Sequence, residues 1–155
     1  MASERDAPTV HLLHVTTDHD GHTVTHRCQV PGLTMRRTIG ASPPLWATEP
    51  NPDPVSRSIW VLPAGWRGGW HTNPQRQLVV PLSGRWWVRT QDGTLTVMGP
   101  GDAHLGDDVD AISNDAGNIG HDSGVDGDEP VVLLMVPIGG EQQPCVGVEE
   151  CPGSI

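Results

Sequence analysis

The 155-residue chain contains no lysine, no tyrosine and no phenylalanine. Without lysine, Schiff-base chemistry and lysine general bases are excluded, and without tyrosine no phenol serves as a general acid or radical site. Acid–base chemistry must therefore come from histidine, aspartate, glutamate or cysteine side chains, or from water bound to a metal. Six tryptophans are the only aromatic residues.

Positive charge is scarce, because nine arginines stand against 19 acidic residues and give a net charge of −10. This balance argues against nucleic-acid binding, which needs a basic surface, and against binding to anionic membranes. No run approaches the roughly 18 apolar residues of a transmembrane helix. The N-terminus also lacks the charged-then-apolar layout of a signal peptide. We therefore expect a cytoplasmic protein.

Cysteine is rare as well. Cys28, Cys145 and Cys151 are an odd number at wide spacing, which favours reduced thiols in a cytosol. Cys145 and Cys151 either pair, bind a metal or stay idle. No histidine lies near them in the sequence, which favours idle thiols in a tail rich in proline and glycine.

Nineteen glycines and fifteen prolines are typical of a chain with many short strands and turns. No segment shows sustained helical spacing, and strand patterns recur every eight to twelve residues or so, as in a sandwich or barrel. We expect an all-β, single-domain barrel with at most one short helix. The expected strands are a hairpin over Val10–Val30, then Ser56–Pro63, a hairpin of Gln77–Leu82 with Arg85–Thr90, Thr94–Met98, Gly101–Gly106 and Pro130–Pro137.

The domain is expected to span residues 10–138, between a flexible arm (1–9) and an irregular tail (139–155). Residues 41–55 hold five prolines and are expected to form a loop, in which Trp46 either covers a pocket or fixes the loop to the core. Asp107–Ile119 is a polar insertion, expected to be a mobile surface flap at the barrel mouth. The five histidines between Val10 and Val30 are expected at the surface or at a sheet edge.

The stretch from Trp66 to Val88 is the most informative part of the sequence. His71 opens a strand pattern, and alternate positions point to the same face. His71, Asn73, Gln75 and Gln77 are therefore expected to share one face, where an imidazole and three amides would line a pocket.

This stretch resembles the first motif of the cupin superfamily, which reads glycine, five residues, His-x-His, three or four residues, Glu, six residues, Gly. Gly65, His71 and Gly84 fall on matching positions. Asn73 stands where the second histidine is expected and Gln77 where the glutamate is expected. Two of the three metal ligands of this motif are therefore amides here.

A group of small bacterial single-domain cupins is more similar still. It shares His-x-x-Pro-x-Arg-Gln (His71, Pro74, Arg76, Gln77), Leu82-Ser83-Gly84, Asp92-Gly93, Pro100-Gly101-Asp102 and Gly120-His121. The resemblance covers about residues 10 to 138 and implies a jelly-roll barrel. Asp107 and Asp108 match acidic positions of this group, although the insertion lengthens the spacing from Gly101 to His121.

The resemblance implies that the strands carrying His71 and His121 are neighbours, with Gln77 beside them. These three residues are the candidate catalytic set, and also the candidate ligands of one divalent ion such as Zn, Fe, Mn or Ni. A metal-free polar pocket is the alternative, and the sequence leaves both open. The other candidates for substrate binding are Asn73, Gln75, Trp70, Trp86, His104 and Trp46.

The remaining expectations concern neighbours of this site. Arg76 has the opposite parity to His71 and Gln77, so we expect it to pair with an acid outside the pocket. Trp86 and Trp87 must face opposite ways. The run from Leu78 to Leu82 is apolar on both faces, which favours a homodimer through sheet packing.

These features favour a small-molecule enzyme with a small organic substrate. Because the first motif lacks its carboxylate, proton-transfer chemistry of the cyclase, isomerase or lyase type is favoured over oxygen activation. The absence of lysine beside many Ala, Gly, Pro and Trp residues suggests a GC-rich bacterial genome. By analogy with other small cupins of such genomes, this favours a tailoring enzyme of secondary metabolism. The alternatives are a metal-dependent cupin dioxygenase and a non-catalytic ligand-binding cupin.

Overall fold

The computed structural model describes residues 9–36, 45–48 and 57–141, and every regular element in these ranges is a strand. The all-β expectation is therefore confirmed. The strands are β1 (His11–Thr17), β2 (Thr23–Gln29), β3 (Thr34–Arg36), β4 (Leu45–Ala47), β5 (Ser58–Leu62), β6 (Gln77–Ser83), β7 (Trp86–Arg89), β8 (Leu95–Met98), β9 (His104–Gly106), β10 (Asp122–Val125) and β11 (Val131–Pro137).

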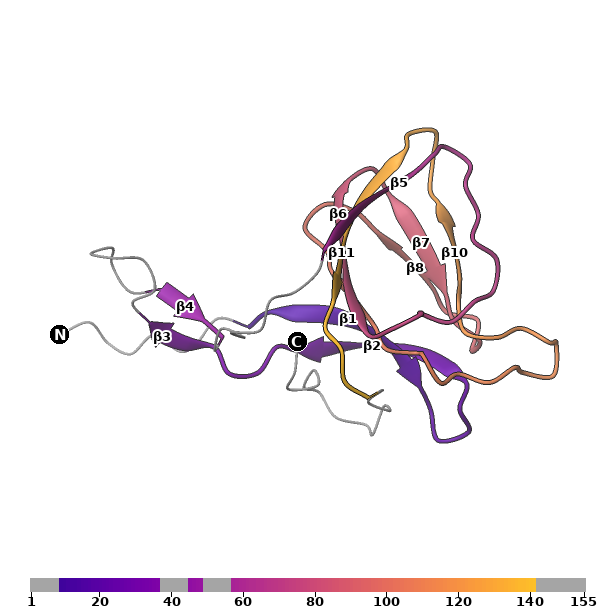
Figure 1. The fold of residues 1–155 in the computed structure, drawn as a ribbon, viewed down its shortest axis with the longest axis horizontal. Helices are drawn as coiled ribbons and strands as arrows, with labels where there is room; N and C mark the ends of the chain where they lie inside the picture. The colour runs from indigo at the N-terminus through magenta and orange to yellow at the C-terminus, as the bar shows by residue number, and fades with distance from the viewer. Residues whose placement is uncertain (1–8, 37–44, 49–56, 142–155) are drawn as a thin grey trace.

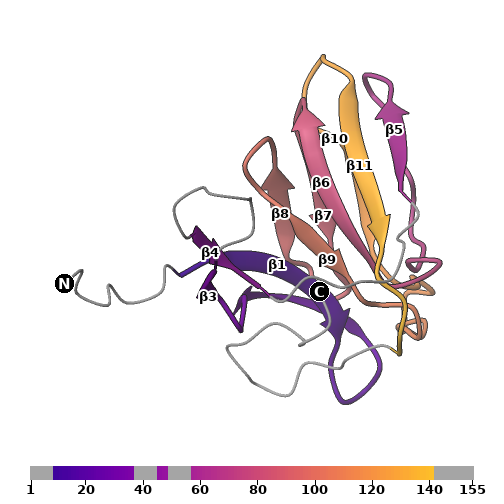
Figure 2. The same cartoon turned by 60° about the vertical axis from the view of Figure 1, so that its left-hand side comes forward.

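Two open sheets form the body of the protein and face each other as a β-sandwich (Figures 1 and 2). The larger sheet has the order β2-β1-β9-β6-β11-β5, and the smaller has the order β10-β7-β8. All neighbours are antiparallel except β1 and β9, which run parallel. The described strands do not close into one barrel. β3 and β4 form a separate two-stranded ribbon that lies away from both sheets (Figure 1).

Alternating side chains from both sheets fill the space between the layers. In β11, Leu133 and Met135 point inward and are 2% and 4% exposed, and in β6 Val79 is 1% exposed. Val88 on β7 and Met98 on β8 meet them from the smaller sheet. Full burial of such side chains contributes about 1.5–3 kcal/mol each, so this shared core holds the two sheets together.

The hairpin expected between Gln77 and Thr90 is wrong. β6 pairs with β9 and β11, whereas β7 pairs with β8 and β10, so the turn at Gly84 carries the chain from one sheet to the other. Gly84 has a φ of +76°, and a side chain there would collide with the backbone of Pro130 and Val131. Glycine is required because the chain crosses close to the start of β11.

Three local expectations also need correction. β10 was not expected, because Asp122–Val125 contains a glycine and little apolar character. Leu45–Ala47 forms the short strand β4 inside the expected loop. The insertion is not wholly a surface flap, because Asp107, Asp108 and Ala111 are buried.

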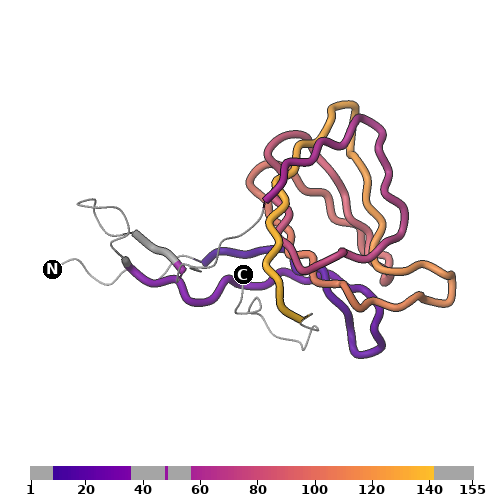
Figure 3. Tube along the Cα trace, in the orientation of Figure 1, coloured from indigo at the N-terminus to yellow at the C-terminus, as the bar shows by residue number. Residues whose placement is uncertain are grey.

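The exposed remainder of the insertion lies against the turn between β1 and β2, where both segments sit at the lower right of the trace (Figure 3). The amide of Ile112 donates to Gly21 O at 3.0 Å. The side chain of Gln91 donates to Ile112 O and Asn118 O, both at 2.7 Å. The Ile112 bond places the loop beside the β1–β2 turn, and the Gln91 bonds fix it to the turn between β7 and β8.

A buried polar cluster lies where the loop before β6 meets the end of β9. Arg76 donates to Asp107 at 2.7 Å, and His14 Nε2 lies 3.0 Å from the same carboxylate. The expectation that Arg76 pairs with an acid is confirmed. The surface expectation is wrong for His14, which is 2% exposed. Its ring packs against the rings and carboxylate of neighbouring strands, with His26 of β2 at 4.8 Å between ring centroids and Asp107, directly after β9, at 3.0 Å.

Trp86 and Trp87 face opposite sides, as expected from their adjacency. Trp86 belongs to the core between the sheets. Trp87 lies on the other face, where Arg67 and Arg89 stand 5.5 and 5.6 Å from its ring centroid.

Cys28 is buried and disulfide-bonded, so the expectation of reduced thiols is wrong for this residue. Disulfides persist mainly in oxidising compartments, so the cysteine argument for a cytoplasmic protein no longer holds. None of the described residues forms a helix of the length and apolarity needed to cross a membrane. Cys145 and Cys151, most of the expected tail and most of the N-terminal arm lie outside the described residues.

Candidate functional site

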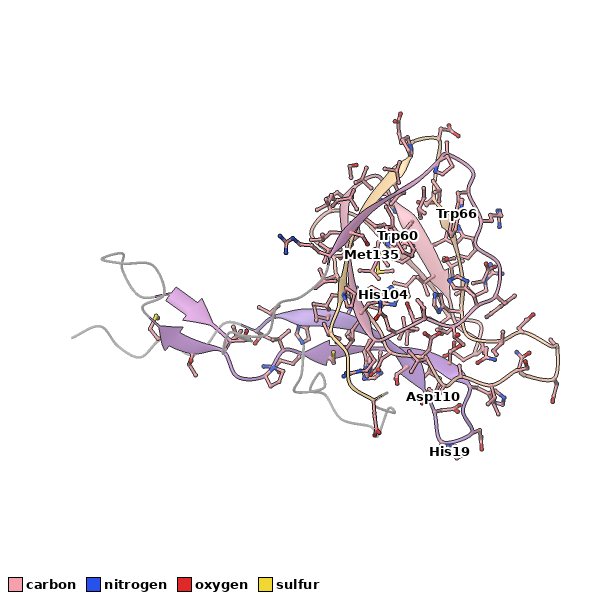
Figure 4. All side chains as sticks on the ribbon, viewed as in Figure 1. His19, Trp60, Trp66, His104, Asp110 and Met135 are labelled. Atoms are coloured by element: carbon pink, nitrogen blue, oxygen red, sulfur yellow. The ribbon has the colours of Figure 1, made fainter. Side chains whose placement is uncertain are left out.

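A cavity lies between the two sheets and is walled by side chains from both. Its volume is about 100 Å³, within a hollow of about 510 Å³ that includes the open mouth. Figure 4 shows Trp60, Trp66, Met135 and His104 gathered around this interior. The lining residues are Trp60, Leu62, Trp66, His71, Asn73, Pro74, Gln77, Val79, Trp86, His104, His121, Ser123, Leu133 and Met135. Trp60 is 46% exposed, so the mouth lies on its side.

His71 and His121 face each other across a backbone bridge, as the resemblance implied. Each donates its amide to the carbonyl of the other at 2.9 Å, and their ring centroids are 4.6 Å apart. Gly120 makes this approach possible, because its φ is +69° and any side chain would collide with the backbone of His71. The bridge fixes both imidazoles on the cavity wall.

The hydrogen bonds of both imidazoles define which nitrogen carries the proton. His121 Nδ1 lies 2.6 Å from Asp108 Oδ2, and His71 Nδ1 lies 2.6 Å from Gly69 O. Carboxylate and carbonyl oxygens only accept, so each Nδ1 carries the hydrogen. In the neutral form, Nε2 of each ring then holds a free lone pair. Neither Nε2 has a hydrogen-bond partner among the described residues.

Asp108 is fully buried and organises the wall behind the cavity. Its Oδ1 accepts from the amide and the side chain of Asn73 at 3.1 and 2.6 Å, and its Oδ2 accepts from His121. Desolvation by burial acts to raise the pKa of this carboxyl, but the hydrogen bonds and charge of His121 and the bonds of Asn73 outweigh it and lower the pKa. Asp108 is therefore an ionised carboxylate that orients His121.

Gln77 is a further polar residue of this cavity wall. Its side-chain amide donates to Asn73 Oδ1 at 2.7 Å, so Gln77 orients Asn73, which in turn holds Asp108. One N–H of Gln77 is thus used within the wall, and the carbonyl oxygen has no partner among the described residues. Arg76 and Asp107, which precede Gln77 and Asp108 in the sequence, face away from the cavity and form a buried ion pair with each other.

His104 lies at the inner end of the cavity, 1% exposed. Its ring centroid is 5.6 Å from that of Trp86 and 6.1 Å from that of His121. Burial, followed by the charge of His121, lowers the pKa of His104 to about 3. The imidazole is therefore neutral at any pH near 7, and neither ring nitrogen has a hydrogen-bond partner within the described part of the chain.

The structure brings most of the expected site residues together. His71, Asn73, Gln77, Trp86, His104 and His121 all line the cavity. Trp70 and Gln75 do not line it: Trp70 is half-buried and Gln75 is exposed. Gln75 precedes β6 in a bend, where the alternation assumed in the sequence does not apply. The side chain of Trp46 lies outside the described residues.

The sequence reasoning did not place Asp108, Trp60 and Met135 in the site. Asp108 had a usable signal, because two adjacent aspartates directly after a strand point to opposite faces and one of them must meet the interior. Trp60 and Met135 had none, because β5 and β11 become neighbours only in the larger sheet. Their side chains reach the cavity through sheet pairing.

No protein-family model matches this chain, and the comparison with curated proteins finds no match either. The geometry of the cavity therefore carries the functional argument.

Proposed function

We propose that this protein is a small-molecule enzyme that transfers a proton on a substrate held in the cavity, as a cyclase, isomerase or lyase does. One observation carries the proposal. The buried Asp108 carboxylate accepts a hydrogen bond from His121 Nδ1 at 2.6 Å, which leaves Nε2 as a base on a largely apolar cavity wall. A carboxylate that fixes the tautomer of a histidine and stabilises its protonated form is a recurrent device of general base catalysis.

His71 supplies the second proton-transfer group. Its Nδ1 is held by Gly69 O, and its ring lies beside that of His121. One imidazole takes a proton from the substrate on its free Nε2, and once it carries this proton it acts as the acid for a neighbouring atom of the same substrate. Gln77 is a positioning residue here, because it acts through Asn73 on Asp108.

We also propose that the sandwich is a jelly roll of the cupin type. The proposal is supported by the opposition of His71 and His121, which match the histidines of His-x-x-Pro-x-Arg-Gln and of the late Gly-His in the small bacterial cupins. The amides at Asn73 and Gln77 depart from the motif. These amides form the hydrogen bonds of the cavity wall: Asn73 donates to Asp108 and accepts from Gln77. A histidine at position 73 would lack the amide that makes both bonds.

Deuterium exchange tests the proposal without knowledge of the product. A library of small carbonyl and hydroxyl compounds is incubated with the protein in D₂O, and mass spectrometry detects compounds that gain deuterium at carbon. His71→Ala and His121→Ala are each expected to slow this exchange at least about 100-fold, because a positioned acid or base contributes about 10² to 10⁴ in rate. His19→Ala is the control, because that side chain is 88% exposed and far from the cavity.

Exchange that continues at the wild-type rate in both variants contradicts the proposal. Compounds that bind without exchange favour the alternative of a non-catalytic ligand-binding protein.

A metal-dependent reaction, including a dioxygenase, is the second candidate. Metal-binding histidines usually donate their other N–H to a carboxylate or carbonyl, as His71 and His121 do. These two rings and the Gln77 carbonyl oxygen would hold a divalent ion, which would polarise a substrate oxygen. The set is a weak one, since the described residues contain no group of three His, Cys, Asp or Glu side chains placed for a metal. Exchange that is lost with a chelator and restored by Zn, Fe, Mn or Ni favours this candidate.

We further propose that the protein is a homodimer that buries the outward face of β5, β6 and β11. On this face Ile59, Val61 and Leu82 are 57%, 62% and 49% exposed, and the three strands contain no charged residue. Monomers rarely expose a continuous apolar patch of this kind, and in a chain of net charge −10 an uncharged face is where two copies repel least.

Sedimentation measures this prediction. The wild type is expected to sediment as a dimer and Val61→Glu as a monomer. Val97→Glu on β8, outside this face, is expected to leave the dimer intact. A monomeric wild type at micromolar concentration would overturn the proposed interface.

A further inference from the structure

The inner end of the cavity contains polar atoms that the protein leaves without partners. Both ring nitrogens of His104 and the Nε1 of Trp86 are buried and make no hydrogen bond to any residue that the structure describes. Buried polar groups nearly always have a partner, and each exception needs an explanation. Both residues line the cavity and their rings lie 5.6 Å apart. Because both residues line the cavity, their three unpartnered atoms indicate which residues a polar group of a ligand would contact.

The chemistry of these atoms limits the ligand group. Trp86 Nε1 only donates, whereas a neutral His104 offers one donor and one acceptor. A hydroxyl oxygen accepts from Trp86 and donates to His104, and a carbonyl oxygen accepts from both. An aliphatic or aromatic C–H group would leave all three atoms unsatisfied.

The charge of the wall limits the ligand further. None of the fourteen lining side chains among the described residues is an arginine, aspartate or glutamate. The nearest charge is the Asp108 carboxylate behind His121. An anion would lose its hydration without gaining a cationic partner and would meet this carboxylate. A cation would have to be buried with the His121 ring between it and the carboxylate. Both losses favour an uncharged ligand.

We propose that the cavity binds the end of an uncharged organic molecule and that a hydroxyl or carbonyl oxygen of this molecule bonds to Trp86 Nε1 and His104. The inference rests on the same cavity as the proposed enzyme activity and names its substrate class. His104 and Trp86 determine specificity, while His121 and His71 act on the bound molecule. The rest of the molecule extends towards the mouth beside Trp60.

Three aromatic probes test this assignment by NMR titration: phenol and toluene, which match in size, and the slightly larger anion benzoate. The wild type is expected to bind phenol at least about tenfold more tightly than toluene, because toluene leaves buried donors unpaired. Benzoate is expected not to bind at concentrations where phenol saturates the cavity. The phenol-to-toluene ratio is expected to fall to near one in Trp86→Phe and His104→Leu, and to persist in His104→Gln, which retains a donor and an acceptor.

The outcome separates this inference from the proposed activity, because binding is measured without turnover. In His121→Ala the preference for phenol is expected to persist, whether or not deuterium exchange is seen in the wild type. Equal binding of phenol and toluene by the wild type overturns the inference. Tightest binding by benzoate, or an unchanged ratio in both Trp86→Phe and His104→Leu, overturns it as well. The wild-type ratio tests the inference even if a variant does not fold.

Discussion

Replacing Asp108 with alanine is expected to lower the free energy of unfolding by about 3–5 kcal/mol. The carboxylate is fully buried and accepts hydrogen bonds from the Asn73 amide, the Asn73 side chain and His121. Alanine leaves these three donors unsatisfied in an interior from which water is excluded. Urea unfolding of the wild type and of Asp108→Ala measures the difference.

Asp108→Asn is the matched variant that separates stability from orientation. Its carbonyl oxygen still accepts from Asn73, so we expect a smaller loss, about 1–2 kcal/mol. Its NH₂ group then faces His121 Nδ1, which has to become an acceptor, so the proton moves to Nε2. Nitrogen-15 NMR of the imidazole reports the tautomer. An unchanged tautomer in Asp108→Asn, or a loss below about 1 kcal/mol in Asp108→Ala, contradicts the assigned role of Asp108.

Acid is expected to destabilise the protein through His104, beginning at pH values well above those at which carboxylates titrate. Burial lowers the pKa of His104 from 6.5 to about 3. Between these values the unfolded chain binds a proton that the folded protein does not, so folding stability is complete above about pH 6.5 and decreases as the pH falls. The expected slope is about 1.4 kcal/mol per pH unit, and the total down to pH 3 is on the order of 5 kcal/mol.

His104→Leu removes this titration. Between pH 6.5 and pH 4, the slope of its unfolding free energy against pH is therefore expected to be smaller than that of the wild type by the equivalent of about one proton. Burial and the charge of His14 also lower the pKa of His26, so a smaller slope of the same sign remains. Asp108 adds pH dependence only below its unfolded pKa of 3.8, because its stabilising effect is constant above that pH. His19→Gln is the control, because that exposed side chain is expected to leave the slope unchanged. A wild-type stability that is flat between pH 6.5 and pH 4 would refute this environment for His104.

Much of the fold follows from local sequence pattern. The β1–β2 hairpin with its Asp-Gly turn, and the strands β5, β6, β8 and β11, lie within a few residues of the ranges expected from alternation and turn chemistry. These features depend on neighbouring residues only. The assignment of β6 and β7 to different sheets depends on Gly84 crossing the start of β11, and a short-range pattern does not contain that contact.

The candidate site divides in the same way. His71, Asn73 and Gln77 were expected on one face from their parity, and His121 was expected beside His71 from the resemblance to the small bacterial cupins. Asp108 was missed as an organising residue because its partners lie 35 and 13 positions away in the sequence. His14 was placed at the surface because nothing local indicates that Asp107, 93 positions away in the sequence, packs against its ring.

The amino-acid composition limits the available chemistry, because a chain without lysine or tyrosine leaves histidine and carboxylate side chains for proton transfer. Glycine and proline set where strands end. Tertiary structure decided what those side chains can do. Asp107 and Asp108 are neighbours with the same covalent structure, yet one pairs with Arg76 and His14 and the other orients His121. The reason is physical. A side chain's protonation state and hydrogen bonds depend on the dielectric and the partners around it, and packing of distant strands creates both.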